Sequence, residues 1–353
     1  MRKMQEYVLR GKEVFVGLED SKRSWKLCVR SDEMIVHETS MPAAYENLES
    51  YFARCFPQCR IKVMYEAGFS GFWLHDRLQG SGIDCVVTPP HTVTQEKANK
   101  VKTDKIDARR LALNLEKGDY KSCSVPDREH REDRQISRTI SQIQRDITSN
   151  RNRIRKFLDF HGLNEGFPAG KFTKGDYQRA RNLSLSHSLE VSLQALFDVV
   201  DKLEELKGKL LLELKAISQK ERYSRSVEIK KSSVGIGWLT ATRLTLEWGD
   251  MRRFSTGNKL SSYVGLTCCE NSSGDRVRRG GITGQGSGLV RSWLIQSAWR
   301  AIRKDPVLLA KFQAVWRNSG SKKKAIVAVA RKLVVRLHSL ERTGDLYRIG
   351  TLQ

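Results

Sequence analysis

The segment VFVGLEDSKRSWKLCV, residues 14–29, sets the architecture of the N-terminal part of the chain. Its first five residues are apolar and β-prone, the acidic pair Glu19 and Asp20 follows without a break, and residues 25–29 again have the character of a strand. In α/β proteins, an acid at the carboxyl end of a strand faces the crevice where ligands bind. The segment therefore predicts a sheet that carries a polar site at one edge.

Alternating strands and helices continue from this segment to about residue 120. The sequence predicts strands at 14–18, 25–30, 34–38, 61–65 and 84–87 and helices at 42–55, 70–80 and 104–117. Three strands followed by strand–helix–strand–helix indicate a mixed sheet flanked by helices. We therefore expect an α/β domain over residues 1–127.

The middle of the chain, residues 128–225, has a different pattern, because apolar residues recur at heptad-like spacing. The first stripe consists of Ile136, Ile140, Ile143, Ile147, Ile154 and Leu158, and the second of Leu189, Leu193, Leu196, Val200, Leu203, Leu206, Leu210, Leu214 and Ile217. A Gly- and Pro-containing break at 162–175 separates them. The pattern predicts a helical coiled-coil arm, either an antiparallel hairpin or an intermolecular coiled coil, with an ordinary helical core as the alternative.

The last part, residues 226–353, is expected to be a mainly α-helical domain. The sequence VGIG, with Gly235 and Gly237, lies between two helical stretches and resembles the turn of a helix-hairpin-helix, in which backbone N–H groups approach a phosphate. Further helices are expected at 254–265, 289–303 and 321–340. A loop rich in Gly, Ser and Arg is expected at 268–288.

Charge is the strongest compositional signal. The 353 residues include 63 Lys and Arg against 40 Asp and Glu, a net charge of +23. Residues 226–353 carry 23 of the basic and only 8 of the acidic side chains. So much positive charge in one part of the chain favours a polyanionic partner such as nucleic acid over an anionic membrane surface, for which the excess would lie on one amphipathic helix.

Apolar residues make up 39% of the chain, and no apolar run is long enough to cross a bilayer. The N-terminal segment MRKMQEYVLRGKE lacks the apolar stretch of a secretory signal. Seven scattered cysteines with no metal-binding spacing indicate reduced thiols. Together these features predict a cytoplasmic protein with no membrane partner.

Acidic residues also follow a second strand and open a helix. Glu66 ends the expected strand 61–65, and Asp104 and Asp107 lie three residues apart, on one face of the helix at 104–117. Carboxylates that approach one another need a cation between them, and a few carboxylates with substrate phosphate are the ligands that Mg²⁺ prefers. The structural alternative is that Asp104 caps the helix, that Asp107 interacts with the helix dipole and that Glu66 is a surface acid.

Several motifs resemble those of the four-acid (DEDD) insertion-sequence transposases. In the N-terminal part these are GLEDSK on the first strand, YEAG after the fourth and KTDKIDARRLA at the start of the helix. In the C-terminal part they are VGIGWLTATRLTLEWGDMRRFSTGNKLSSYVGLT followed by ENSSGDRVRRGGIT. The resemblance covers nearly the whole chain. It implies a RuvC-like, RNase H-fold catalytic domain and a C-terminal transposase domain that carries a serine.

The resemblance implies a magnesium site formed by Glu19, Glu66, Asp104 and Asp107. The first position departs from the family pattern, because Gly-Ile-Asp usually leads the strand, whereas here Gly17 and Leu18 are followed by Glu19 and then Asp20. Alignment favours Glu19. Asp20 would reach the site only if the strand slipped by one residue, and such a slip moves its side chains to the other face.

The resemblance also implies a serine nucleophile in a Ser-Gly context, which matches Ser273, with Ser272 as the close alternative. In the family such a serine is thought to attack a DNA phosphate and form a covalent phosphoserine link. The neighbouring Arg276, Arg278 and Arg279 suit phosphate binding. Taken alone, SSGDRVRRGG would be interpreted as a basic loop.

The resemblance implies an insertion-sequence recombinase that cuts and exchanges strands of donor and target DNA, guided by a noncoding RNA of the element, the bridge RNA. Its members work as homo-oligomers, and a dimer or a tetramer is expected because the acids of one subunit act with the serine of another. Two other functions stay open. One is a RuvC-like hydrolytic junction nuclease that uses the same acids with water, and the other is a catalytically inactive nucleic-acid-binding scaffold.

Overall fold

The computed structural model describes residues 9–90, 103–270 and 279–350. The chain divides into two compact units, Met1–Val125 and Pro126–Gln353. The largest hydrophobic cluster of each unit is built from residues of that unit alone. The expected division into three domains, with a separate arm at 128–225, stays a prediction.

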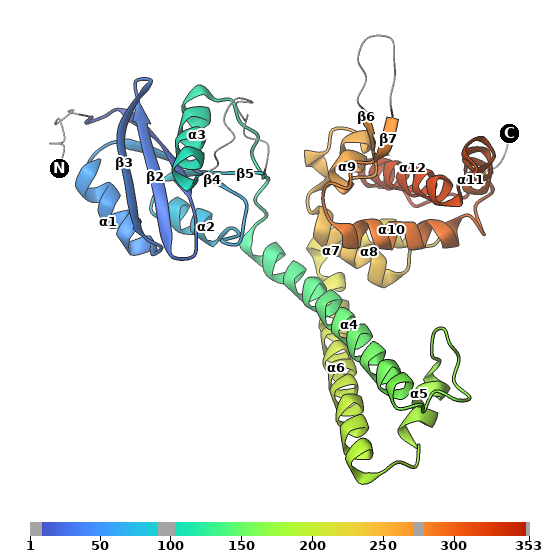
Figure 1. Ribbon diagram of the computed structural model, residues 1–353. Helices are drawn as coiled ribbons and strands as arrows, with labels where there is room; N and C mark the ends of the chain where they lie inside the picture. The colour runs from blue at the N-terminus through green and yellow to red at the C-terminus, as the bar shows by residue number, and fades with distance from the viewer. Residues whose placement is uncertain (1–8, 91–102, 271–278, 351–353) are drawn as a thin grey trace. The chain divides into compact units, whose positions relative to one another are not determined.

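The first unit is built on a five-stranded sheet (Figure 1). Its strands are β1 (Glu13–Glu19), β2 (Ser24–Ser31), β3 (Met34–Pro42), β4 (Arg60–Glu66) and β5 (Asp84–Thr88). Their order in space is β3-β2-β1-β4-β5. The pairs β1–β2 and β2–β3 are antiparallel, and the pairs β1–β4 and β4–β5 are parallel. The predicted mixed sheet is confirmed, and each strand lies where the sequence pattern indicates.

Helices cover both faces of this sheet. Val14, Val16 and Leu18 of β1 are fully buried in one cluster with apolar side chains of α1 (Tyr45–Cys55) and α2 (Trp73–Gly80). The opposite face is covered by α3 (Asp104–Lys117), which packs on β1, β2 and β4. The alternation of side chains along β1 therefore assigns its even-numbered residues to α1 and α2 and its odd-numbered residues to α3.

Gly17 allows α3 to lie directly on the sheet. A Cβ atom at this position would be 2.0 Å from the carbonyl oxygen of Ala108 and 2.4 Å from the backbone nitrogen of Ala112. Both atoms belong to the backbone of α3, so neither can move aside without shifting the whole helix. The close approach explains why a residue without a side chain interrupts an otherwise bulky strand.

Ion pairs hold both ends of α3 against the sheet. Near its C-terminus, the half-buried Arg30 of β2 donates to Glu116 at 2.5 Å, and Glu116 also accepts from the backbone N–H of Glu33 at 2.9 Å. Near its N-terminus, Glu38 of β3 accepts from Arg109 and pairs with Lys105 at 3.2 Å. The direction and register of α3 are thus fixed at both ends.

The second unit begins with two long helices, α4 (Arg128–Phe160) and α6 (His187–Gln219), with the short α5 (Lys174–Arg181) between them. Buried residues from both long helices form one cluster. These helices pack on each other within the chain, as the two apolar stripes indicate. A coiled coil with a second copy of the chain stays a prediction.

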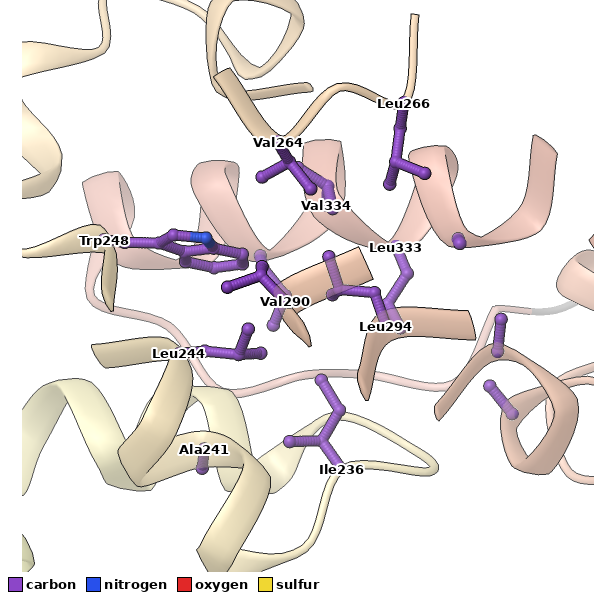
Figure 2. Close-up of a cluster of buried hydrophobic side chains, with 14 of the residues drawn as sticks. Ile236, Ala241, Leu244, Trp248, Val264, Leu266, Val290, Leu294, Leu333 and Val334 are labelled. Atoms are coloured by element: carbon purple, nitrogen blue, oxygen red, sulfur yellow. The ribbon is translucent and has the colours of Figure 1, made fainter. Parts of the chain in front are cut away.

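The rest of the second unit is mainly helical, as expected. Its elements are α7 (Glu221–Ser232), α8 (Trp238–Trp248), the 3-10 turn η1 (Met251–Arg253), α9 (Gly257–Val264), β6 (Cys268–Glu270), β7 (Arg279–Ile282), α10 (Gly288–Ala301), α11 (Pro306–Ser319) and α12 (Lys322–Thr343). Figure 2 shows Trp248 and Leu244 of α8, Leu294 of α10 and Leu333 of α12 in the shared core. Ile140 of α4 joins the same cluster.

Some elements of the second unit were missed by the sequence analysis. These are α5, η1, α11 and the β6–β7 hairpin, which lies in the segment expected to be a loop. The start of α11 carries a recognisable signal, because Asp305 caps the helix and Pro306 occupies its first turn. The hairpin carries a weaker signal, since β6 has three residues and β7 has four.

No helix within the described ranges is both long and apolar enough to span a membrane.

Candidate active site

Glu19 and Glu66 are the last residues of β1 and β4, two neighbouring parallel strands. The register pairs Gly17 with Met64 and Leu18 with Tyr65, so its continuation sets Glu19 beside Glu66. Met64 packs with α3, and Gly17 lies against α3. Because side chains alternate along a strand, Glu19 and Glu66, two residues further on, belong to the α3 face of the sheet.

The first turn of α3 lies at the same edge of the sheet. Phe15 packs with Leu111 and Leu115, and Gly17 contacts Ala108, so α3 runs in the opposite direction to β1. Its N-terminus, which the side chain of Thr103 caps, therefore lies towards the carboxyl end of the strand. The acids of this turn are Asp104, which is exposed, and Asp107, which is buried with 6% of its surface accessible.

The backbone thus brings the four sequence-predicted acids to one edge and one face of the sheet, but their side chains do not form a closed ligand set. Among the residues that the structure describes, no three His, Cys, Asp or Glu side chains form a group that could hold a metal ion. Asp107 is instead ion-paired with Arg110, one turn further along α3. The donor set itself fits Mg²⁺, because it consists of carboxylate oxygens alone.

Asp20, the alternative to Glu19, directly follows β1. It is buried, and its Oδ2 atom has no hydrogen-bond partner among the described residues. Burial raises the pKa of the Asp20 carboxyl, the nearby Glu66 carboxylate raises it further, and a hydrogen bond from Ser70 acts in the opposite direction. A buried carboxylate oxygen of this kind, near a second carboxylate on Glu66, is an oxygen ligand that a bound cation would satisfy. The alternation along β1 favours Glu19 on the α3 face, and Asp20 stays the alternative ligand.

The β6–β7 hairpin carries the expected serine segment. Its paired residues are Cys268 with Ile282 and Glu270 with Arg279. The sequence-predicted Ser272, Ser273, Arg276 and Arg278 lie outside the described residues. The remaining predicted phosphate contact, Arg279, is the first residue of β7.

Arg291 of α10 fixes the base of this hairpin. Its Nη1 atom donates to the carbonyl oxygens of Val264, Gln285 and Gly286 at 3.1, 2.7 and 3.2 Å. A Cβ atom on Gly265 would be 2.0 Å from the carbonyl oxygen of Gln285, so the end of α9 and the segment that follows β7 are in direct backbone contact. One guanidinium thus joins α9, α10 and the segment after β7.

Replacing Arg291 by Gln is expected to slow strand exchange about tenfold to a hundredfold, because a small displacement of a reacting group has effects of this size. The three carbonyl oxygens lose their shared donor, and the hairpin base is released. Metal affinity of the N-terminal unit, measured by calorimetric titration of the same variant, should not change. An equal loss of metal affinity would contradict a role confined to the hairpin.

The two glycines of VGIG have different surroundings. Gly235 has a φ of +87°, and a Cβ atom there would be 2.4 Å from the carbonyl oxygen of Ser297 in α10. Packing against α10 therefore explains why position 235 is a glycine, and its contact with phosphate stays a prediction. Gly237 is the N-cap of α8 and has open space at its Cβ position, so it keeps room for a phosphate at a helix N-terminus.

The strand order β3-β2-β1-β4-β5, with acids at the carboxyl ends of β1 and β4, is consistent with the RNase H-like class of nucleic-acid-processing enzymes. A family model of IS110-type DEDD transposases matches residues 16–162, and a second model, the transposase IS116/IS110/IS902 family, matches residues 228–313. The two matches together span more than half of the chain. The chain belongs to the DEDD insertion-sequence transposases of the IS110 type, enzymes that cleave and recombine DNA.

Curated relatives align with this chain over most of their own length. A putative transposase of Sinorhizobium fredii, y4rJ, is 28% identical, and the alignment covers 94% of this chain and 92% of the relative. A second protein of that organism, the putative transposase y4qE, is 25% identical over 82% of this chain and 72% of the relative. The transposase for insertion sequence element IS1111A of Coxiella burnetii is 24% identical over 82% of this chain and 79% of the relative.

Proposed function

We propose that this transposase exchanges DNA strands with a magnesium site formed by Glu19, Glu66, Asp104 and Asp107 and with a serine nucleophile at Ser273 or Ser272. One observation carries the proposal: two acids that end neighbouring strands and two acids of one helical turn lie at the same edge and on the same face of the sheet. Acids scattered over the surface for solubility would not share such a position.

The magnesium ion, when bound, would neutralise charge that develops on the reacting phosphate. The residues of the chain then have separate tasks. Glu19 and Glu66 project from strand ends that are fixed by the sheet register, and Asp107 is buried on a helix that ion pairs hold at both ends. Such fixed carboxylates would hold the ion without a large rearrangement of the backbone.

The serine would supply the nucleophile. Its hydroxyl oxygen forms a bond to a DNA phosphorus while a deoxyribose oxygen leaves and takes up a proton. The resulting phosphoserine ester conserves the energy of the broken phosphodiester bond, which is then used to join a second strand. Arg291 supports this role, because it fixes the end of α9 and the segment after β7, which flank the hairpin, and a nucleophile needs a rigid base. Arg276, Arg278 and Arg279 would hold the DNA phosphates.

We further propose that an element-encoded noncoding RNA guides the enzyme and that it acts as a dimer or tetramer. The charge of +23, concentrated in the C-terminal part, supports contact with nucleic-acid backbones over a large surface. In this arrangement, base pairing would read the sequence of donor and target DNA. The protein would recognise mainly backbone and shape.

The experiment that tests the nucleophile replaces both Ser272 and Ser273 by Ala. The double variant is expected to lose the covalent protein–DNA adduct, which denaturing electrophoresis detects with end-labelled DNA, and each single variant shows which hydroxyl reacts. A double variant that still cuts DNA would support the hydrolytic nuclease. A catalytically inactive scaffold would be supported if the wild type formed no recombined DNA and variants of Asp104 and Asp107 left its nucleic-acid binding unchanged.

A further inference from the structure

Two arginines of α4 and one of η1 lie near the C-terminal end of α8, which carries Glu247. Arg138 of α4 binds Glu247 of α8 with two hydrogen bonds of 2.8 and 2.9 Å. Arg253 of η1 donates to the carbonyl oxygen of Trp248, and its guanidinium lies 4.6 Å from the ring centre of Tyr263 in α9. The remaining arginine is Arg134, one turn before Arg138 on α4. We refer to Arg134, Arg138, Arg253, Glu247 and Tyr263 as the arginine cluster.

Arg134 is the arginine of this cluster without a hydrogen bond or ion pair among the described residues, and it is half-buried. Glu247 is already bound by Arg138 on both oxygens. Burial lowers the pKa of the Arg134 guanidinium and repulsion from Arg138 lowers it further, while the Glu247 carboxylate acts in the opposite direction.

The cluster holds one carboxylate, Glu247, for three guanidinium groups, and Arg138 binds both of its oxygens. A partly desolvated Arg134 therefore costs folding free energy unless a further anion completes the group. A structural role does not account for Arg134, because a neutral side chain would fit the same place at lower electrostatic cost. Phosphate is the anion that suits converging guanidinium groups. Tyr263 is 44% exposed beside Arg253, so it adds a hydroxyl and an aromatic face of the kind that nucleic-acid sites use.

The position of the cluster connects it to the serine hairpin. The carbonyl oxygen of Tyr263 would be 2.2 Å from a Cβ atom on Gly286, in the segment that follows β7. The neighbour of Tyr263 in sequence, Val264, is buried in the core and offers its carbonyl oxygen to Arg291. Figure 2 shows Val264 and Trp248 in this core. Tyr263 and Glu247 directly precede them in sequence, near the ends of α9 and α8.

We propose that Arg134, with Arg253 and Tyr263, binds a backbone phosphate of nucleic acid at the base of the serine hairpin, while Arg138 and Glu247 hold the site in shape. The inference rests on the proposed function, because it locates one contact of the nucleic acid that the transposase handles. The phosphate belongs either to DNA or to an RNA, since both offer the same group.

The test compares Arg134→Gln with Arg145→Gln in the full chain. Arg145 is an exposed arginine of the same helix, so both changes remove one positive charge from α4. Binding of a duplex DNA oligonucleotide and, separately, of a single-stranded RNA is measured at several salt concentrations. For one lost phosphate contact, the slope of log affinity against log salt should fall by about 0.9 with duplex DNA or about 0.7 with a single strand.

Arg134→Gln is expected to show this fall with one of the two nucleic acids, and that nucleic acid is the source of the phosphate. Arg145→Gln should change the slope much less, and Arg134→Lys should restore most of it, because lysine keeps the point charge. The melting temperature of Arg134→Gln without nucleic acid should equal or exceed that of the wild type. A purely structural arginine would give a lower melting temperature instead.

An unchanged slope and affinity for Arg134→Gln, in a folded protein, would overturn the phosphate site and leave the proposed function intact, because the wild type would still bind. A lower melting temperature together with an unchanged slope would assign Arg134 a structural role. Failure of the wild type to bind either nucleic acid would contradict both the site and the proposed function.

Discussion

Replacing Asp107 by Asn is expected to reduce the rate of strand exchange about a thousandfold, the size of effect seen when a preorganised charge is removed from a phosphoryl- or acyl-transfer site. The side chain is buried in the first turn of α3. Asn keeps the shape but lacks the charge. The rate is measured as formation of recombined donor–target DNA under single-turnover conditions.

The matched control is Asp84→Asn. Asp84 begins β5 and lies beside Lys62, at the opposite edge of the same sheet from Glu66. The substitution Asp84→Asn removes the same charge from the same unit. It should leave the rate of strand exchange within about twofold of the wild type, because surface substitutions generally have small effects. Equal rates for the wild type and for Asp107→Asn would contradict a catalytic role of the α3 acids.

Replacing Gly17 by Ala is expected to lower the free energy of unfolding of the first unit by about 3 kcal/mol, at the upper end of the usual cost of overpacking. The added methyl group would meet two backbone atoms of α3 at 2.0 and 2.4 Å. The helix must therefore move away from β1, and the acids of its first turn move with it. Hydrogen exchange of β1 and α3 in the full chain, followed by mass spectrometry, measures the loss.

Gly80→Ala provides the control for this substitution. Gly80 ends α2, and a Cβ atom there meets nothing within 4 Å. Alanine should leave stability unchanged or raise it by less than about 1 kcal/mol. If Gly17→Ala kept the wild-type exchange protection and the wild-type rate of strand exchange, the close contact of α3 with the sheet would be wrong.

The fold of the first unit could be predicted because its strands are short apolar runs with clear ends. The role of Gly17 could not, since the sequence does not show which helix lies against a strand. The same limit applies to Gly235, because a side chain at this position would meet α10, more than fifty residues further along the chain. The hairpin at β6 and β7 was missed because so few of its residues pair.

The acids were recognised as candidates because each stands at the end of a strand or the start of a helix. Their common face follows only from the register of β1 with β4 and from the contact of α3 with Gly17. The arginine cluster had no sequence signal, because Arg134, Arg253 and Tyr263 lie far apart and arginine is abundant throughout a chain with a net charge of +23.

The central claim is that acids ending β1 and β4 and opening α3 share one metal ion. Crystals of the protein grown with Mn²⁺, an ion that replaces Mg²⁺ at oxygen sites and scatters anomalously, test this claim most directly. We expect an anomalous peak between Glu66, Asp107 and either Glu19 or Asp20, with Arg110 displaced from Asp107. A metal-saturated crystal with no peak at this edge of the sheet, or with Asp107 still paired to Arg110, would contradict it.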